Sequence, residues 1–164
     1  MPATYEPIAT QTISTASAAV VFNSIPQTYT DLVVVVDSRF TQASGRWMGV
    51  RLNNDTGANY STIYMAGTGS GAISAFFEDT ALRIGNGSAS SARSGSMAHI
   101  ANYTNTSAYK VSISRSVTNE YAISYTSHWR SNSAVTTLTF VCDTAESNQF
   151  MAGSVFSVYG IKAA

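Results

Sequence analysis

Short runs of β-branched and aromatic residues alternate along the chain with clusters of Gly, Asn, Ser and Asp, about one run in every ten residues. This spacing is typical of strands and turns, and no segment repeats its apolar residues at the helical period. The pattern predicts twelve strands, at residues 8–14, 19–22, 32–39, 47–52, 60–65, 72–77, 82–84, 97–103, 109–117, 121–129, 135–142 and 154–161. Twelve strands in one domain imply two packed sheets, so we expect an all-β, antiparallel two-sheet sandwich that is jelly-roll-like.

Alternation within two of these segments indicates which face of a strand is buried. Val111, Ile113 and Val117 share one parity, and the residues of the other parity are Lys110, Ser112, Ser114 and Ser116. Tyr121, Ile123 and Tyr125 repeat the pattern. Such alternation is typical of antiparallel strands with one face against the core and one against water. We therefore expect the apolar set to face the core.

The segment at residues 32–36 is apolar at every position. An exposed apolar edge strand invites aggregation, so this strand is expected to be central in its sheet. Leu32, Val34 and Val36 would face one layer, and Val33 and Val35 would face another. This second layer could be the flank of the opposite sheet, a covering loop or an adjacent subunit.

Turn residues punctuate the chain. Residues 53–57 and 85–87 contain Asn and Gly, which tolerate positive φ between strands, and residues 85–95 have the composition of a loop. Pro26 ends the preceding strand because it cannot donate to a ladder. No repeat or linker divides the chain, so we expect one domain over residues 1–164, with residues 1–15 as an N-terminal strand or an arm that contacts neighbours.

Composition narrows the classes of function. Charged residues make up 11% of the chain, against roughly 25% in soluble domains, and Ser plus Thr supply about a quarter. The net charge is zero and the nine basic residues are scattered, which argues against binding to nucleic acid or to an anionic membrane. A near-neutral surface resists self-association only weakly, which suits a subunit that packs against neighbours.

The chain shows no signal peptide and no apolar run long enough to span a membrane, so we expect synthesis in the cytoplasm of its host cell. Cys142 is the single cysteine, which excludes an internal disulfide framework and a cysteine-rich zinc site. It lies in an apolar run and is expected to be a small buried side chain.

Candidate catalytic groups are sparse. Residues 55–57 read Asp-Thr-Gly, as in aspartic proteases, but two asparagines precede them where those enzymes have an apolar strand, so a turn is expected. Neither His99 nor His128 has a second metal-type ligand at i+2 or i+4, and no nucleophile elbow accompanies them.

Paired carboxylates remain the open catalytic alternative, since four acidic residues could converge in space: Glu78, Asp79, Glu120 and Glu146. Nine acids placed mostly at turns make this a minor alternative. We therefore expect no catalytic residues, no metal and no cofactor, and a protein that is not an enzyme.

Aromatic residues are the best candidates for a binding site. Sandwich faces in carbohydrate-binding modules present such side chains for stacking on sugars, and Tyr and Trp are also enriched in cores and at subunit interfaces. The candidate glycan or interface aromatics are Trp47, Tyr60, Tyr64 and Trp129.

One stretch of the chain reads Phe22-Asn23-Ser24-Ile25-Pro26-Gln27-Thr28-Tyr29-Thr30-Asp31-Leu32 and leads into an apolar strand that closes on Arg39. This stretch resembles a recurrent family of small virion proteins of tailed bacteriophages, common in phages of aquatic bacteria. The resemblance continues at residues 51–60, at Trp129-Arg130 and in the ending at residues 153–161, Gly-Ser-Val-Phe-Ser-Val-Tyr-Gly-Ile.

The resemblance implies a non-enzymatic structural component of the virion, either a capsid decoration (cement) protein or a fibre- or tail-associated subunit. Its expected partners are further copies of itself, in a homo-oligomer such as a trimer, and other virion proteins. The alternative is a receptor- or carbohydrate-binding β-sandwich module that binds a host surface glycan through exposed aromatics.

Overall fold

The computed structural model describes residues 5–42, 46–67, 69–87, 92–118, 122–143 and 148–162. These residues form twelve strands, each overlapping one predicted segment: β1 (Tyr5–Thr12), β2 (Ala19–Phe22), β3 (Asp31–Ser38), β4 (Arg46–Leu52), β5 (Tyr60–Gly67), β6 (Ala72–Asp79), β7 (Leu82–Gly87), β8 (Ser94–Ala101), β9 (Lys110–Val117), β10 (Ala122–Trp129), β11 (Leu138–Cys142) and β12 (Val155–Ile161). Within them there is no helix of the length and apolarity needed to cross a lipid bilayer.

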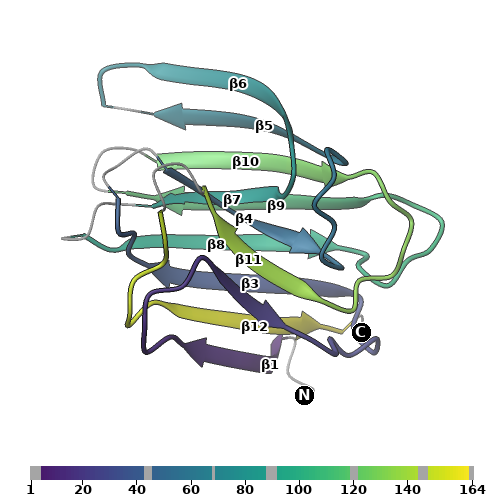
Figure 1. Ribbon diagram of the computed structural model, residues 1–164. Helices are drawn as coiled ribbons and strands as arrows, with labels where there is room; N and C mark the ends of the chain where they lie inside the picture. Colours follow the sequence, from purple (N-terminus) through teal and green to yellow (C-terminus); the bar gives the residue numbers. More distant parts are fainter. Residues whose placement is uncertain are drawn as a thin grey trace.

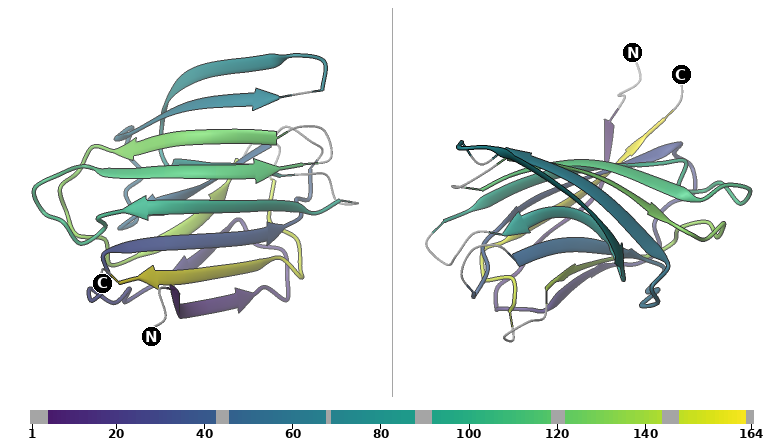
Figure 2. Two further views of the ribbon diagram at one scale, coloured as in Figure 1. Left: turned by 180° about the vertical axis from the view of Figure 1, so that it is seen from behind. Right: turned by 90° about the horizontal axis from the view of Figure 1, so that it is seen from above.

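The strands form an eight-stranded sheet, in the order β1-β12-β3-β8-β9-β10-β5-β6, and a four-stranded sheet, in the order β2-β11-β4-β7. Every pairing in both sheets is antiparallel. The two sheets stack face to face (Figure 1 and Figure 2). The predicted all-β, antiparallel two-sheet sandwich is confirmed.

Eight of the strands reproduce a jelly roll. The sheet segment β1-β12-β3-β8 stacks on β2-β11-β4-β7, so the chain changes sheet at each step from β1 to β4. A jelly roll is a double sheet of this kind. The other four strands are two hairpins: β5–β6 follows β4, and β9–β10 follows β8. The hairpins pair through β10 and β5 and lengthen the larger sheet. We call these four strands the extension, and the other eight the jelly-roll strands.

The main hydrophobic core lies between the two sheets. The ring centroid of Phe140 is 5.6 Å from that of Phe22 and 5.2 Å from that of Phe156, which in turn is 4.9 Å from that of Phe150. All four rings are buried. Of the buried residues in this core, only Tyr60 and Trp129 come from the extension. The jelly-roll strands therefore build the core largely by themselves.

Strand β3 is central, as predicted, between β12 and β8. Leu32, Val34 and Val36 are fully buried against the other sheet, and Val33 on the opposite face is buried as well. Val35, on the same face as Val33, is 39% exposed in the single chain, so neither a loop nor the other sheet covers it, and cover by an adjacent subunit stays a prediction. The larger side chains of Tyr159 and His99 flank Val33 across the register, whereas the smaller Ser157 and the flexible Met97 flank Val35.

Strand β9 is oriented opposite to the prediction. Its serines and Lys110 are buried, whereas Val111, Ile113 and Val117 are 41–57% exposed. On the neighbouring β10, Ile123 and Tyr125 are buried, as predicted.

The close approach of β7 explains why β9 buries small polar side chains. A Cβ atom at Gly85 would collide with the hydroxyls of Ser96 and Ser116. The Ser96 hydroxyl donates to Ser116 Oγ at 2.9 Å, and the Ser127 hydroxyl on β10 donates to the carbonyl of Arg83 at 3.3 Å. Valine or isoleucine would not fit in this space, and the hydrogen bonds offset the cost of burying hydroxyls.

The turns are as predicted in one of two places. Asn53 and Asn54 adopt φ values of 53° and 58° in the turn after β4. Residues 85–87 were expected to form a turn but lie within β7, because their glycines permit close packing. Of the loop predicted at 85–95, only residues 92–93 are described outside strands, and residues 88–91 lie outside the described part.

The N-terminal segment forms β1, which pairs with β12 of its own chain from Tyr5 to Thr12. The first four residues of the expected N-terminal strand or arm lie outside the described part of the chain.

Candidate interaction surface

The outer face of the eight-stranded sheet, which points away from the four-stranded sheet, carries many exposed apolar side chains. Eight of them are 39–66% exposed: Val35, Ile63, Met65, Phe76, Met97, Val111, Ile113 and Val117. We call these eight residues the outer apolar face, and six of them belong to the extension. Exposed apolar patches are common at interaction sites, so the outer apolar face is a candidate interaction surface.

The register of the strands aligns these residues in rows. Phe76 lies opposite Ile63, which lies opposite Thr126 and then Ile113. Val35 lies opposite Met97 in a second row. Side chains directly opposite each other on neighbouring strands are roughly 5 Å apart, so each row forms a nearly continuous ridge.

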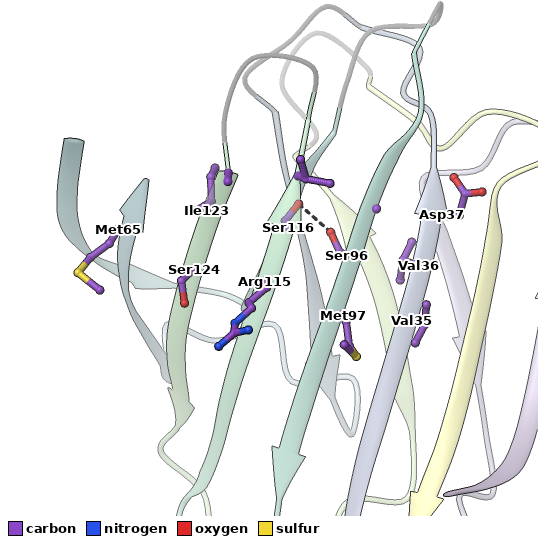
Figure 3. A pocket seen from close by; sticks show the side chains of 13 residues that line it. Val35, Val36, Asp37, Met65, Ser96, Met97, Arg115, Ser116, Ile123 and Ser124 are labelled. Carbon is purple, nitrogen blue, oxygen red and sulfur yellow. Dashed lines mark hydrogen bonds between the residues drawn. The ribbon is translucent and has the colours of Figure 1, made fainter. Parts of the chain in front are cut away.

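The first of two depressions on this face lies over β3, β8, β9 and β10 and has a volume of about 700 Å³. Figure 3 shows Met65 at one side, Val35 at the other, and Met97 and Arg115 between them. Val117 completes the apolar lining. The depression is broad enough to receive several side chains of another molecule.

The second depression, of about 420 Å³, lies over the extension. Its lining includes Ile63, Phe76 and Val111. The ring of Tyr109 stacks on that of His128 at its rim, with centroids 6.4 Å apart and planes 5° apart.

Few charges interrupt the outer apolar face. Asp37 accepts a hydrogen bond from Arg93 Nε at 2.6 Å, and Asp31 lies 2.9 Å from His99 Nε2. Arg115, exposed in the first depression, forms no salt bridge within the described part of the chain.

Two of the predicted site aromatics lie in the core. Tyr60 and Trp129 are buried and stacked, with ring centroids 6.2 Å apart. Burial raises the pKa of the Tyr60 hydroxyl, which donates to the carbonyl of Asp55. Neither ring is accessible to a sugar or to another subunit, because both fill the space where the extension meets the jelly-roll strands.

The carboxylate of Asp55 holds this junction together. It accepts hydrogen bonds from Trp129 Nε1 at 2.7 Å, from the Gly57 backbone N–H at 2.8 Å and from Asn59 Nδ2 at 3.0 Å. Burial acts to raise the pKa of Asp55, but these three hydrogen bonds outweigh it and hold the pKa below its ordinary value. The Asp-Thr-Gly triplet therefore belongs to a turn that these hydrogen bonds stabilise.

The other two predicted aromatics are half-buried in a stack beneath the extension. The guanidinium of Arg83 on β7 lies 5.0 Å from the ring centroid of Trp47 and 4.2 Å from that of Phe77. Tyr64 stacks on Phe77, with centroids 5.7 Å apart and planes 3° apart. Trp47 and Tyr64 thus help to join β5 and β6 to the smaller sheet, and they do not form a platform with Tyr60 and Trp129.

The predicted acids do not converge in the described residues. Glu78 and Asp79 are adjacent on β6 and point to opposite faces, as neighbours in a strand do. Asp79 pairs with Arg83, and Glu120 and Glu146 lie outside the described part of the chain. Within the described residues, no three His, Cys, Asp or Glu side chains gather to hold a metal ion.

Cys142 is buried, as predicted, and its thiol donates to the carbonyl of Asn148 at 3.3 Å. Burial raises the pKa of the thiol to about 11, so it is a structural and unreactive group.

The outer apolar face was not predicted from the sequence. Val111, Ile113 and Val117 were assigned to the core, and Phe76 and Met97 were not singled out. The available signal was the run of serines on β9 together with Gly85 and Gly87 on β7. Small residues on both sides of a contact are compatible with close packing of two strands.

Comparison with known proteins identifies no relative. No family model matches the chain, and no curated protein matches it. Among solved structures, an engineered GH43 glycoside hydrolase with endo-xylanase and exo-arabinofuranosidase activity is 12% identical, with a TM-score of 0.37 over 94% of this chain and 34% of that one. The enzymatically active domain of tailspike protein 2 of bacteriophage CBA120 is 10% identical, with a TM-score of 0.28 over 98% of this chain and 29% of that one. The chain thus spans about a third of either structure's length, and similarities this weak carry no argument about function.

Proposed function

We propose that the chain is a non-enzymatic structural component of a tailed-phage virion, either a capsid decoration protein or a fibre- or tail-associated subunit. In this proposal it attaches to neighbouring virion proteins through the outer apolar face. The main support for this proposal is that the outer apolar face exposes eight large apolar side chains, six of them on strands of the extension.

The energetics of burial support attachment through this face. Covering apolar surface contributes about 25 cal/mol per Å², and the two depressions allow a partner's side chains to interlock with the sheet. Charged residues make up only 11% of the chain, so such contact removes few charged groups from water and its desolvation free energy is small.

Two weaker lines of support point to a virion. Jelly rolls recur in viral capsid proteins and in lectins, which is an analogy of fold and not of site. The segment from Phe22 to Leu32 resembles small virion proteins of tailed phages.

Mass spectrometry of purified virions tests the proposal, together with incorporation of outer-face variants. We expect the chain in the particle, and we expect Ile113→Asp and Val117→Asp to fold normally but to be lost from it. Val21→Asp, at an exposed apolar residue on the four-stranded sheet, is the matched control and should be incorporated normally. Absence of the wild-type chain from purified virions would refute the proposal.

Glycan binding is the second candidate, and the second depression is the observation that favours it. Tyr109 and Phe76 are 54% and 60% exposed there, beside His128. A glycan array would detect binding that Tyr109→Ala abolishes without lowering the melting temperature. No binding to any glycan would remove this candidate.

A further inference from the structure

The two edges of the eight-stranded sheet differ in how they are protected. At one edge, β1 contains Pro7 and a β-bulge between Pro7 and Ala9. Its Glu6 also holds Lys162 Nζ at 2.9 Å, beside the hydroxyl of Tyr29. Proline, bulges and charges are the devices by which natural proteins prevent an edge strand from pairing with another chain.

At the other edge, β6 has no proline and no bulge, and its charged residues, Glu78 and Asp79, lie only at its C-terminal end. It pairs with β5 over eight consecutive residues without a bulge, and its sequence Ala-Ile-Ser-Ala-Phe-Phe-Glu-Asp contains no proline and no lysine. Ile73 and Phe76, on opposite faces, are 51% and 60% exposed. The strand lies at the far end of the extension and protrudes beyond the four-stranded sheet (Figure 1 and Figure 2). Its outward backbone N–H and C=O groups are a template for one more strand.

We propose that β6 pairs with β6 of a second copy of this chain, antiparallel and about a twofold axis, to give a dimer with one continuous sixteen-stranded sheet. The inference rests on the free edge and is independent of the proposed function. It replaces the expectation of a trimer with a twofold assembly.

The distribution of charge along β6 favours the antiparallel arrangement. Both acids, Glu78 and Asp79, lie at the C-terminal end of the strand, and the N-terminal end begins with Ala72. Antiparallel pairing sets the acidic end of each copy beside the uncharged end of the other, whereas parallel pairing would align like charges.

The bulged edge disfavours a closed ring. A three-fold ring built by sheet extension would require β6 of one copy to pair with β1 of the next. Pro7 lacks an N–H, and the bulge after it breaks the register, so that pairing is impaired. Pairing of β6 with itself avoids the protected edge and closes the assembly at two copies. Rotation about a twofold axis perpendicular to the sheet does not exchange its two sides. The outer apolar faces of both copies would therefore lie next to each other on the same side of the joined sheet.

Sedimentation of the purified chain across a wide concentration range provides the first test. We expect a concentration-dependent rise from the monomer mass of 17.4 kDa to a dimer mass of about twice that value. Ser74→Lys, at an exposed position in the middle of β6, brings two like charges together and should weaken the dimer by about tenfold or more. Thr12→Lys adds the same charge to the protected edge and should change the dissociation constant by less than about twofold.

Cysteine cross-linking provides the second test and reports the register. Residues next to the twofold axis face their own copies at about 4.5–5.5 Å between Cα atoms, which lies within the range of a disulfide. Among Ile73→Cys, Ser74→Cys, Ala75→Cys and Phe76→Cys, at least one should oxidise to a disulfide dimer. Gln11→Cys on β1 should not, and the buried Cys142 does not interfere.

Two results would overturn the proposal. One is a chain that remains at 17.4 kDa at every concentration and forms no disulfide dimer at any of the four positions. The other is a dimer that tolerates Ser74→Lys and yields no cross-link, which would assign the contact to a different surface.

Discussion

The jelly-roll strand β12 and strand β9 of the extension bury opposite kinds of side chain. Strand β12 turns Phe156 and Val158 inward, and both are fully buried between the sheets. Strand β9 turns Ser112, Ser114 and Ser116 inward and leaves its valines and isoleucine exposed. Hydrophobic burial therefore accounts for the jelly roll, whereas β9 keeps its apolar residues on the outer surface of the extension.

This difference is the basis of our proposal that the extension contacts other molecules through its outer surface. Its inner face is held by hydrogen bonds to β7 and by the stack of Trp47, Arg83, Phe77 and Tyr64. The outer apolar face contributes little to stability while it is exposed to water. Matched substitutions at inner and outer positions should therefore change the stability of the fold by unequal amounts.

The largest difference is expected between Val34→Asp and Val35→Asp. Val34 is fully buried in the core, so an aspartate there is an unpaired buried charge and should cost more than about 3 kcal/mol of unfolding free energy. Val35 is exposed on the outer apolar face, where the same change should cost less than about 1 kcal/mol. Urea unfolding of both variants measures the difference, and equal losses would contradict the assignment of faces.

Gly85→Ala tests the contact between β7 and the serines of β8 and β9. The added methyl would collide with Ser96 and Ser116, so we expect a loss of about 1–3 kcal/mol. At Gly95 the nearest atom to an added Cβ is Val117 Cγ1 at 4.0 Å, so Gly95→Ala should change stability by less than about 1 kcal/mol. Thermal unfolding of the two variants provides the measurement. A stable Gly85→Ala variant would show that the two sheets are more loosely packed than described.

Asp55→Asn tests the junction between the two parts of the molecule. Hydrogen bonds from Trp129, Asn59 and Gly57 lower the pKa of Asp55 in the folded state. The ionised carboxylate therefore stabilises the fold at pH values above its ordinary pKa, and the effect is lost as the pH falls through the lowered pKa. At neutral pH we expect the variant to lose about 1–2 kcal/mol, with the difference from wild type shrinking in acid. A difference that does not vary with pH would contradict this role.

The smallest effect on stability is expected for Val117→Cys. The new thiol and the native Cys142 should differ clearly in their reactivity. Burial raises the pKa of Cys142 to about 11, so its thiolate fraction at pH 8 is on the order of 100-fold below that of an ordinary thiol. Val117→Cys, on the outer apolar face, should react with iodoacetamide at an ordinary rate. Mass spectrometry of timed samples resolves the two sites, and rapid labelling of native Cys142 would indicate local opening of the jelly roll.

The sequence was sufficient to predict the strands, because alternation and turn residues are local signals. It also placed β3 in the middle of a sheet, since five consecutive apolar residues are incompatible with an edge. The orientation of β9 could not be predicted in this way. The choice between burying Ser114 and burying Ile113 depends on how closely β7 approaches, and β7 is distant in the sequence. The outer apolar face was missed for the same reason, whereas Tyr60 and Trp129 were predicted as candidate glycan or interface residues but lie in the core.

A cryo-EM map of the purified virion tests the central claim most directly. We predict density for this chain with Ile113, Val117 and Met97 covered by a neighbouring protein and with the four-stranded sheet more exposed than the outer apolar face. A map in which the chain is present but the outer apolar face is in contact with solvent alone would contradict the account.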